Sequence, residues 1–479
     1  MGERRRPSAD LQFYEGEDSM KNYELKDVPT PNLLEDMFPY SLPPLIEFEG
    51  TIHEWIDGKN VEFDPADVRT RDIHITDTTF RDGQQARPPY SKEQMVRLFE
   101  MMSRLGGPQG VIRQSEFFLY TKNDRETIDA CRALNLRFPE ITGWIRANKG
   151  DFRLVKEMGL KETGMLTSSS DYHIFHKQNQ TRKQAMDQYV EVVEAAFEAG
   201  VRPRCHLEDV TRADLPGFVF PFVQKLERLS EQVPDHMKVK IRLCDTMGFG
   251  LSYPNAAEPR SIPKLIWRLR NEIGISPDRL EWHGHNDFHK VHINGASAWI
   301  YGLDALNSTL FGFGERTGNP PLEGAVMEYV ALKGALNGVD LSVITELAQY
   351  YEKVIGTQLS SNYPFVGKDF NTTRAGIHAG GLRKFEQIYN IFDTAALLNR
   401  PPRVAITDKS GSDGVALWVN EYLGLKGDER LTVMKVAKIF RWVMDQYEKD
   451  GRMSSITDQE LEEQVKQQLP EYYNKYKKN

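Results

Sequence analysis

From residue 72 to about residue 335, short runs of β-branched and apolar residues alternate with longer helical patterns, and the alternation repeats eight times. The expected strands lie at 72–76, 110–117, 141–145, 162–167, 201–207, 239–243, 280–283 and 304–310. The expected helices lie at about 91–105, 123–134, 150–158, 181–199, 216–232, 261–273 and 288–301, and an eighth begins near 322. Eight strand–helix units in about 260 residues match the size and order of a (β/α)8 barrel, the TIM barrel, in the α/β class.

The same alternation also occurs in doubly wound open sheets. Such a sheet commonly carries a Gly-rich phosphate loop directly after its first strand, and no such loop follows residues 72–76. The barrel is therefore the favoured fold.

The segments outside the alternation differ in texture. Residues 1–70 are rich in proline and charge, so an irregular N-terminal extension is expected before a catalytic barrel at 71–335. Mixed linker subdomains at 336–425 and a C-terminal helical segment at 426–479 are expected to follow.

Charge and composition exclude several classes of protein. The 61 Lys and Arg against 69 Asp and Glu give a net charge of −8, which argues against a nucleic-acid binder. No apolar run approaches the roughly 18 residues that a membrane helix needs. Three cysteines are too few for a disulfide framework, and we expect a soluble protein of the reducing cytoplasm.

In a barrel of this kind, the active site lies at the C-terminal ends of the strands. Charged and polar residues follow five of the expected strands: Asp77, Arg81, Asp82 and Gln85; Glu208 and Asp209; Asp245 and Thr246; His283, His285, Asn286 and Asp287; and Glu315, Arg316 and Asn319. We expect these residues to gather at the mouth of the barrel.

The pair His283-Gly-His285 is the most informative local feature. Residues two apart on a strand point to the same face, so both imidazoles can bind one metal ion. Asp82, expected at the same rim, would supply a third ligand. The alternative is an accidental pair of histidines in a chain that has 11 of them.

Other residues at the mouth have two readings each. Arg81 suits the stabilisation of a developing oxyanion, although it could form an ordinary ion pair with Asp82. Glu208 is either a base or a helix-capping carboxylate. The glycines of the loop 312–319 suit close approach of the backbone to a ligand, or a plain flexible turn.

Three stretches carry a resemblance to a known family: Asp77-Thr-Thr-Phe-Arg-Asp-Gly-Gln-Gln85, His283-Gly-His-Asn-Asp287 and Gly314-Glu-Arg-Thr-Gly-Asn319. Together they resemble the DRE-TIM metallolyase superfamily. Within it they are similar to the acyl-CoA-condensing branch, which holds the isopropylmalate, homocitrate, citramalate and Re-citrate synthases. The similarity spans roughly residues 72 to 412.

The resemblance implies a division of labour at the site. Asp82, His283 and His285, with Asn319 directly or through water, would ligate a divalent cation that chelates a 2-oxo acid. Mn²⁺ is the expected metal, with Co²⁺, Mg²⁺ and Zn²⁺ as alternatives. Arg81 would steady the keto oxygen, and Gln85 would line the same pocket. Thr246 resembles the threonine that holds the substrate carboxylate.

The resemblance also implies a base for the methyl group of acetyl-CoA, the co-substrate. Glu208 and His378 resemble the acid–base residues, and Tyr389 follows His378 at the spacing of the family. In this family the segment with His378 and Tyr389 reaches into the barrel of a neighbouring subunit, which implies a homodimer.

Two departures weaken parts of the resemblance. Gln84 stands where many members carry Glu, and Thr407-Asp-Lys-Ser-Gly411 replaces the later family pattern Gly-Lys-His-Ser-Gly. The residues after Lys409 are also too few for the leucine-sensing domain of many isopropylmalate synthases, so we expect no such feedback.

The 2-oxo acid is inferred from one arginine. Arg204 lies four residues before Glu208, so both side chains are expected to point into the barrel. In homocitrate synthases an arginine at this spacing pairs with a distal carboxylate, a task that suits a bidentate guanidinium. Arg113 could serve likewise or form a structural ion pair. A dicarboxylic acid, oxaloacetate or 2-oxoglutarate, is therefore expected.

The long extension, the stretch Arg87-Pro-Pro-Tyr90 and the pair Pro320-Pro321 resemble the Re-citrate synthase group most, which favours oxaloacetate. A homocitrate, isopropylmalate or citramalate synthase is the alternative within the branch. A carbon–carbon lyase of the HMG-CoA lyase type is a further alternative, although the Cys usual after the last strand of that group is missing here. A catalytically silent barrel that acts as a binding subunit also stays open.

Overall fold

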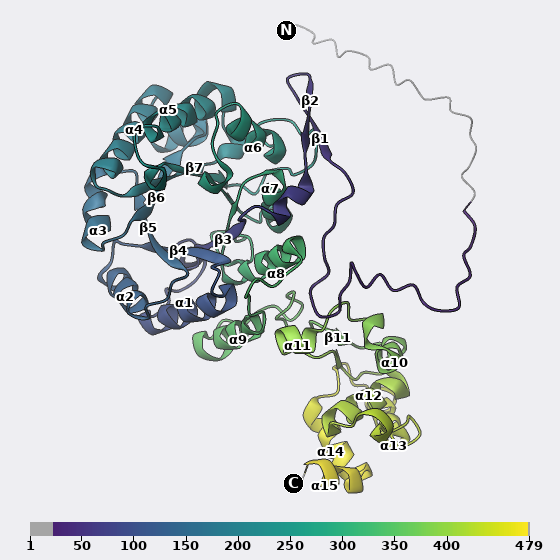
Figure 1. Ribbon diagram of the computed structural model, residues 1–479. Coiled ribbons are helices and arrows are strands. Elements are labelled where there is room, and N and C mark those ends of the chain that lie inside the picture. Colours follow the sequence, from purple (N-terminus) through teal and green to yellow (C-terminus); the bar gives the residue numbers. More distant parts are fainter. Residues whose placement is uncertain (1–22, 478–479) are drawn as a thin grey trace. The chain divides into compact units, whose positions relative to one another are not determined.

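The computed structural model describes residues 23–477. These residues belong to two compact units, one ending at Glu35 and the other beginning at Asp36, and everything below concerns the second unit. It contains a closed barrel of parallel strands (Figure 1). The strand order is β10-β3-β4-β5-β6-β7-β8-β9. The barrel expected from the sequence is confirmed.

The barrel strands are β3 (His74–Asp77), β4 (Ile112–Phe118), β5 (Glu140–Arg146), β6 (Glu162–Ser168), β7 (Arg202–Glu208), β8 (Lys240–Asp245), β9 (Leu280–Gly284) and β10 (Ala305–Ser308). The barrel helices are α1 (Lys92–Gly106), α2 (Lys122–Ala133), α3 (Phe152–Glu157), α4 (Arg182–Glu198), α5 (Phe220–Ser230), α6 (Ile262–Asn271), α7 (Val291–Tyr301) and α8 (Leu322–Lys333).

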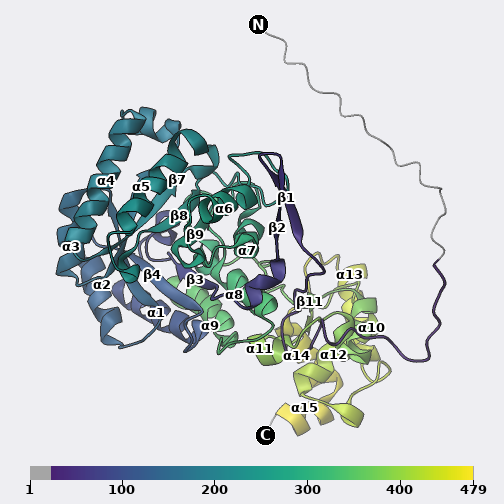
Figure 2. The same ribbon diagram turned by 45° about the horizontal axis from the view of Figure 1, so that its top comes forward.

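Local sequence signals explain where the barrel helices begin. The side chains of Ser91, Thr121 and Thr181 each accept a hydrogen bond from the backbone N–H three residues on. The side chain of that third residue in turn accepts one from the backbone N–H of the capping residue, which makes three capping boxes. The buried faces of these helices cover the strands, as both views show (Figures 1 and 2).

The interior of the barrel is charged rather than apolar. Glu116 on β4, Arg204 on β7, and Arg242 and Glu281 on β8 and β9 are all at most 3% exposed. Arg242 donates to Glu116 at 3.0 Å and to Glu281 at 2.7 Å. Because buried charges are costly unless they are paired, this network fixes which side chain faces which across the barrel.

The expectation of an irregular extension is wrong for part of the range 1–70. Strands β1 (Ile52–Ile56) and β2 (Lys59–Phe63) form an antiparallel hairpin. Asp57 and Gly58 connect them, both with positive φ, which is the turn that an Asp-Gly pair favours. The hairpin packs on α6, where Lys264 approaches Glu54 at 3.6 Å (Figure 2).

The residues after the barrel form further helices and a short parallel strand pair. They are α9 (Ser342–Tyr350), β11 (Thr372–Thr373), α10 (Gly376–Lys384), α11 (Thr394–Leu398), β12 (Arg403–Val404), α12 (Gly411–Leu423), α13 (Ala437–Glu448), α14 (Asp458–Gln468) and α15 (Pro470–Lys477). Buried residues from Ala379 to Leu469 make a second core of their own. Within residues 23–477, no helix has the length and apolar character needed to cross a membrane.

Candidate active site

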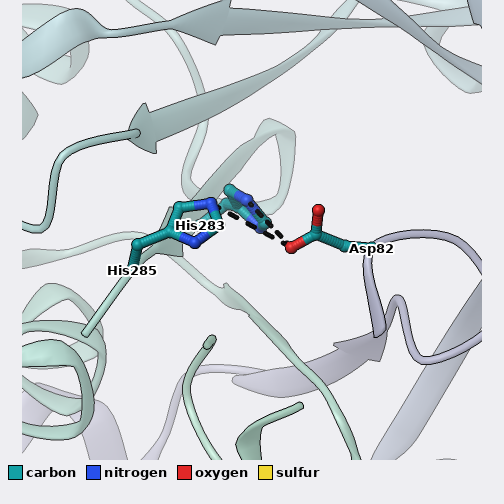
Figure 3. Close-up of side chains that lie close together, drawn as sticks. All are labelled: Asp82, His283 and His285. Atoms are coloured by element: carbon teal, nitrogen blue, oxygen red, sulfur yellow. Dashed lines mark ion pairs between the residues drawn. The ribbon is translucent and has the colours of Figure 1, made fainter. Parts of the chain in front are cut away.

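Three side chains from two strand ends converge at the mouth of the barrel (Figure 3). His283 and His285 come from the end of β9, and Asp82 lies in the loop after β3, at the start of a 3-10 turn. The Oδ2 atom of Asp82 lies 4.0 Å from Nε2 of His283 and 4.0 Å from Nε2 of His285. The three residues expected to ligate a metal are therefore brought together.

Burial and charge prepare these side chains as ligands. Burial lowers the pKa of His283 to about 3, with the neighbouring His285 acting in the same direction. Burial also lowers the pKa of His285. Burial alone would raise the pKa of Asp82, but Arg81 and the two histidines outweigh it and hold that pKa below its ordinary value. Neutral imidazoles beside a carboxylate are the protonation states that bind cations.

A hydrogen-bond chain orients the ring of His283. Its Nδ1 atom lies 2.7 Å from Oδ1 of Asn307 on β10. Asn307 in turn donates from Nδ2 to the hydroxyl of Thr76 on β3 at 2.9 Å. Metal-binding histidines are usually fixed through the second ring nitrogen in this way, which leaves Nε2 toward Asp82.

The oxygen atoms at the site fit a divalent cation. Oδ2 of Asp82 and Oδ1 of Asn319 are both buried and have no hydrogen-bond donor within the described residues. Both converge on Gly314, where an added Cβ would stand 1.7 Å from Oδ1 of Asn319 and 3.2 Å from Oδ2 of Asp82. Buried acceptors without a partner are costly. A cation bound by two imidazoles and two oxygens would satisfy them.

Arg81 lies beside the three ligands and is held from two sides. Its Nε donates to Glu116 at 2.8 Å and its Nη1 to Asp82 at 3.1 Å. Both partners are buried. Its second terminal nitrogen, Nη2, makes no hydrogen bond within residues 23–477. This nitrogen of the guanidinium therefore remains free to donate to a ligand.

Glu208 ends β7 at the same rim and is ionised. Burial would raise its pKa, but hydrogen bonds from His173 and Ser168 and the charge of Lys177 lower the pKa to about 2. Lys177 lies 3.0 and 3.1 Å from the two carboxylate oxygens. Thr246, after β8, accepts a hydrogen bond from the backbone of Asp209 at 2.8 Å. Gln85 is exposed in the loop that carries Asp82.

The two arginines expected at the substrate both pair with carboxylates of the chain itself. Arg204 is 1% exposed inside the barrel and donates to Glu116 at 2.7 Å and to Glu162 at 3.0 Å. Arg113 stands at the start of β4, the end away from the mouth, and pairs with Asp72 at 3.0 Å, the structural ion pair that its sequence position also allowed. For Arg204, binding of a distal carboxylate remains a prediction.

His378 lies on α10, and Tyr389 lies just after a short helical turn at 386–388. Their rings contact each other with centroids 4.5 Å apart. Both side chains are exposed. Within the described chain, no hydrogen bond or ion pair joins either of them to Asp82, His283 or His285.

Sequence reasoning missed the residues that hold the site together. Glu116 anchors Arg81, and His173 and Lys177 surround Glu208. For Glu116 a signal was available, because Gln114 and Glu116 put polar side chains at a period of two on a buried strand. His173 and Lys177 come after β6 and satisfy the same strand-end rule that identified the other residues.

Comparison with known proteins assigns the barrel to a family. Residues 72–350, more than half of the chain, match the family described as HMGL-like. The match includes all three motifs that carried the DRE-TIM resemblance and ends before His378. Asp82, His283, His285 and Asn319 thus all lie inside the family region.

Several curated proteins are similar over nearly the whole chain. The chain is 52% identical over 455 residues to a citrate (Re)-synthase of Syntrophus aciditrophicus (strain SB), covering 94% of this chain and 70% of that protein. It is 47% identical over 456 residues to a citrate (Re)-synthase of Clostridium kluyveri, covering 95% and 97%. It is 41% identical over 399 residues to a 2-phosphinomethylmalate synthase of Streptomyces hygroscopicus, covering 82% and 88%. With its strand-end motifs and closed barrel, the chain belongs to the HMGL-like family, as the DRE-TIM resemblance predicted.

Proposed function

We propose that this protein is a citrate (Re)-synthase, which condenses acetyl-CoA with oxaloacetate and water to citrate and CoA. One observation carries the proposal. The cluster of Asp82, His283 and His285 lies at the mouth of the barrel, in a chain that is 52% identical over 455 residues to a citrate (Re)-synthase. The chemistry needs a carbon acid to lose a proton, a ketone to accept the resulting carbanion, and a thioester to be hydrolysed.

In the proposal, a divalent cation is held by Asp82, His283, His285 and Asn319. Mn²⁺ is the expected metal, and Co²⁺, Mg²⁺ and Zn²⁺ are the alternatives. When bound, such a cation supplies Lewis acidity for the keto group of the 2-oxo acid. The donor set of two imidazole nitrogens and two oxygens supports this assignment.

Arg81 stabilises the keto oxygen as negative charge develops on it. A buried guanidinium that is already fixed by Glu116 and Asp82 needs no reorganisation during the reaction. Thr246 holds the carboxylate beside the keto group, and Gln85 lines the same pocket. Arg204 is the residue assigned to the distal carboxylate of oxaloacetate. Arg113 pairs with Asp72 at the opposite end of the barrel and has no part in this assignment.

Glu208 and His378 move the proton of the acetyl methyl group, with Tyr389 beside His378. Glu208 is ionised, as a proton acceptor must be, and its pKa of about 2 makes it a weaker base than an ordinary carboxylate. The new carbon–carbon bond joins the acetyl methyl carbon to the keto carbon. Water then cleaves the thioester and CoA leaves as the thiol.

His378 and Tyr389 reach the site from a second copy of the chain in this proposal. The segment around them exposes several large apolar side chains, which a partner would cover: Ile377, Phe385, Ile388, Tyr389 and Ile391 are 46 to 79% exposed. A homodimer with shared active sites follows. The buried free cysteines Cys131, Cys205 and Cys244 support a reducing cytoplasm as its compartment.

The test is thiol release from acetyl-CoA with oxaloacetate, 2-oxoglutarate, pyruvate and 2-oxoisovalerate in parallel. The proposal expects release with oxaloacetate and citrate as the product. Strong release with another acid would instead identify the protein as a homocitrate, isopropylmalate or citramalate synthase. If no acid supports thiol release but the protein cleaves a 3-hydroxyacyl-CoA, the result would favour a carbon–carbon lyase of the HMG-CoA lyase type.

A further inference from the structure

The chain that precedes the barrel is fixed at two points, and the first is Tyr40. The carbonyl oxygen of Tyr40 accepts a hydrogen bond from the backbone of Asp393 at 2.7 Å. Its hydroxyl donates to the carboxylate of Glu386 and accepts a hydrogen bond from Asn390 at 3.1 Å. Backbone and side chain of one residue thus contact three positions of the segment 386–393.

The second point lies on the barrel. The backbone N–H of Ile46 donates to the carbonyl oxygen of Ala331 on α8 at 3.0 Å. The carbonyl oxygen of Ile46 accepts from Arg69 at 3.2 Å, and Leu42 and Ile46 pack against the barrel core. Residues 40–46 therefore span from the segment 386–393 to an outer helix of the barrel, and we call them the strap.

The segment that the strap holds contains Tyr389. Glu386 and Asn390, both bonded to Tyr40, stand on either side of Tyr389, and Asn390 also donates to Glu386 at 3.0 Å. The ring of Tyr389 rests on α10 where Gly381 leaves room, since a Cβ there would stand 2.7 Å from the ring. From that position the ring contacts His378.

These contacts make one chain of support: Tyr40 fixes Glu386 and Asn390, these fix the turn of Tyr389, and Tyr389 packs on His378. Without the strap, the exposed turn 386–389 would keep its short helical hydrogen bonds, the bond from Asn390 to Glu386 and the ring contact of Tyr389 with His378. Segments with few buried contacts open with little free energy, so an added anchor there changes the population of the ordered form directly.

We propose that Tyr40 is a positioning residue, and that the strap orders the His378–Tyr389 pair for its role in catalysis. The inference rests on the proposed function for the catalytic consequence, but the ordering of residues 386–394 does not depend on the reaction.

The experiment compares Tyr40→Phe with wild type and with Ser41→Ala, an exposed neighbour on the strap, by hydrogen–deuterium exchange of the full-length protein and by steady-state kinetics. Tyr40→Phe keeps the ring and the backbone bond to Asp393 but removes the hydroxyl. We expect amides in 386–394 to exchange about tenfold faster in Tyr40→Phe, with exchange of the barrel strands unchanged.

In the same variant kcat should fall about fivefold or more, while KM for oxaloacetate and the affinity for Mn²⁺ stay at the wild-type values, because the binding groups sit on the barrel. Glu386→Gln, which removes the acceptor charge, should reproduce both effects. Unchanged exchange in 386–394 would overturn the inference whatever reaction the protein catalyses. Faster exchange with unaltered kcat would overturn the catalytic role alone, and a chain with no synthase activity would count against the proposed function without touching the exchange result.

Discussion

The Nε atom of Arg81 donates a hydrogen bond of 2.8 Å to Oε2 of Glu116, and this contact joins the mouth of the barrel to its charged interior. The same oxygen of Glu116 accepts from Arg242 at 3.0 Å and from the hydroxyl of Thr78 at 3.0 Å. A guanidinium held this way cannot rotate toward solvent. The barrel interior therefore acts as a rigid mount for the residue assigned to the developing oxyanion.

Replacing Arg81 by lysine tests whether the fixed guanidinium of Arg81 stabilises the developing oxyanion. Lysine keeps the charge but cannot bond Glu116 and Asp82 and still present a donor to the ligand, because it lacks the planar fork. We expect kcat to fall about 100- to 1,000-fold, the usual loss for an oxyanion donor. Affinity for Mn²⁺, measured by calorimetry, should change far less. A variant with kcat within twofold of wild type would contradict the role.

Asn307 gives a test of the metal site that leaves all its ligands in place. Asn307→Ala removes the contact to Nδ1 of His283, so the imidazole loses its fixed orientation. Loss of such a partner typically costs about 10- to 100-fold in metal affinity. Asn271→Ala, an exposed asparagine on α6, is the matched control and should bind Mn²⁺ as wild type does.

Arg204→Ala separates a structural from a substrate-binding role. The substitution leaves the buried carboxylates of Glu116 and Glu162 without a partner, and breaking a buried pair of this kind costs about 3 to 5 kcal/mol. We expect a clear drop in Tm. Thermal unfolding measured beside KM for oxaloacetate decides the matter, because an unchanged Tm with a raised KM would assign Arg204 to the distal carboxylate alone.

The lowered pKa of Glu208 makes the free energy of unfolding depend on pH. Its pKa in the folded protein is about 2, below the value of about 4.3 in an unfolded chain, so the ionised side chain stabilises the fold above the unfolded value. That contribution, about 3 kcal/mol, is lost as the pH falls from about 4.5 to about 2. Wild type should therefore be more stable than Glu208→Gln near neutral pH, and the gap should close across that range. A gap in Tm that stays constant to low pH would contradict the assignment.

Mixing two inactive variants tests the shared active site. Asp82→Ala and His378→Ala each remove one component, and a mixed dimer regains one intact site when the components come from different copies. After subunit exchange at equal concentrations, about a quarter of the wild-type activity should return. No recovery, in a sample shown by light scattering to contain mixed dimers, would mean that both residues act within one copy.

The sequence was sufficient to predict the barrel and the convergence of the three candidate metal ligands. All eight barrel strands formed where the alternation predicted them, because parallel strands and their covering helices carry strong local patterns. The convergence of Asp82 with His283 and His285 followed from two rules, the period of two along β9 and the position of loops at the carboxyl ends of strands.

Those rules could not predict which buried charged side chains pair with one another inside the barrel. The period of two placed Arg204 inside correctly, but its bonds to Glu116 on β4 and Glu162 on β6 depend on the stagger between strands. The hairpin at Ile52–Phe63 was missed because prolines elsewhere in the extension outweighed the Asp57-Gly58 turn signal. The contact of Tyr40 with Glu386 joins residues 346 positions apart, and no local pattern reports such a contact.

The most direct test of the metal-dependent synthase is thiol release from acetyl-CoA and oxaloacetate by protein stripped with EDTA, with and without added Mn²⁺. Wild type and Asp82→Asn are compared, with His53→Ala, an exposed histidine of β1, as the control. We predict no release after stripping, recovery with Mn²⁺ in wild type and His53→Ala, and no recovery in Asp82→Asn. Full release by the stripped wild-type protein, or recovery in Asp82→Asn equal to wild type, would contradict the account.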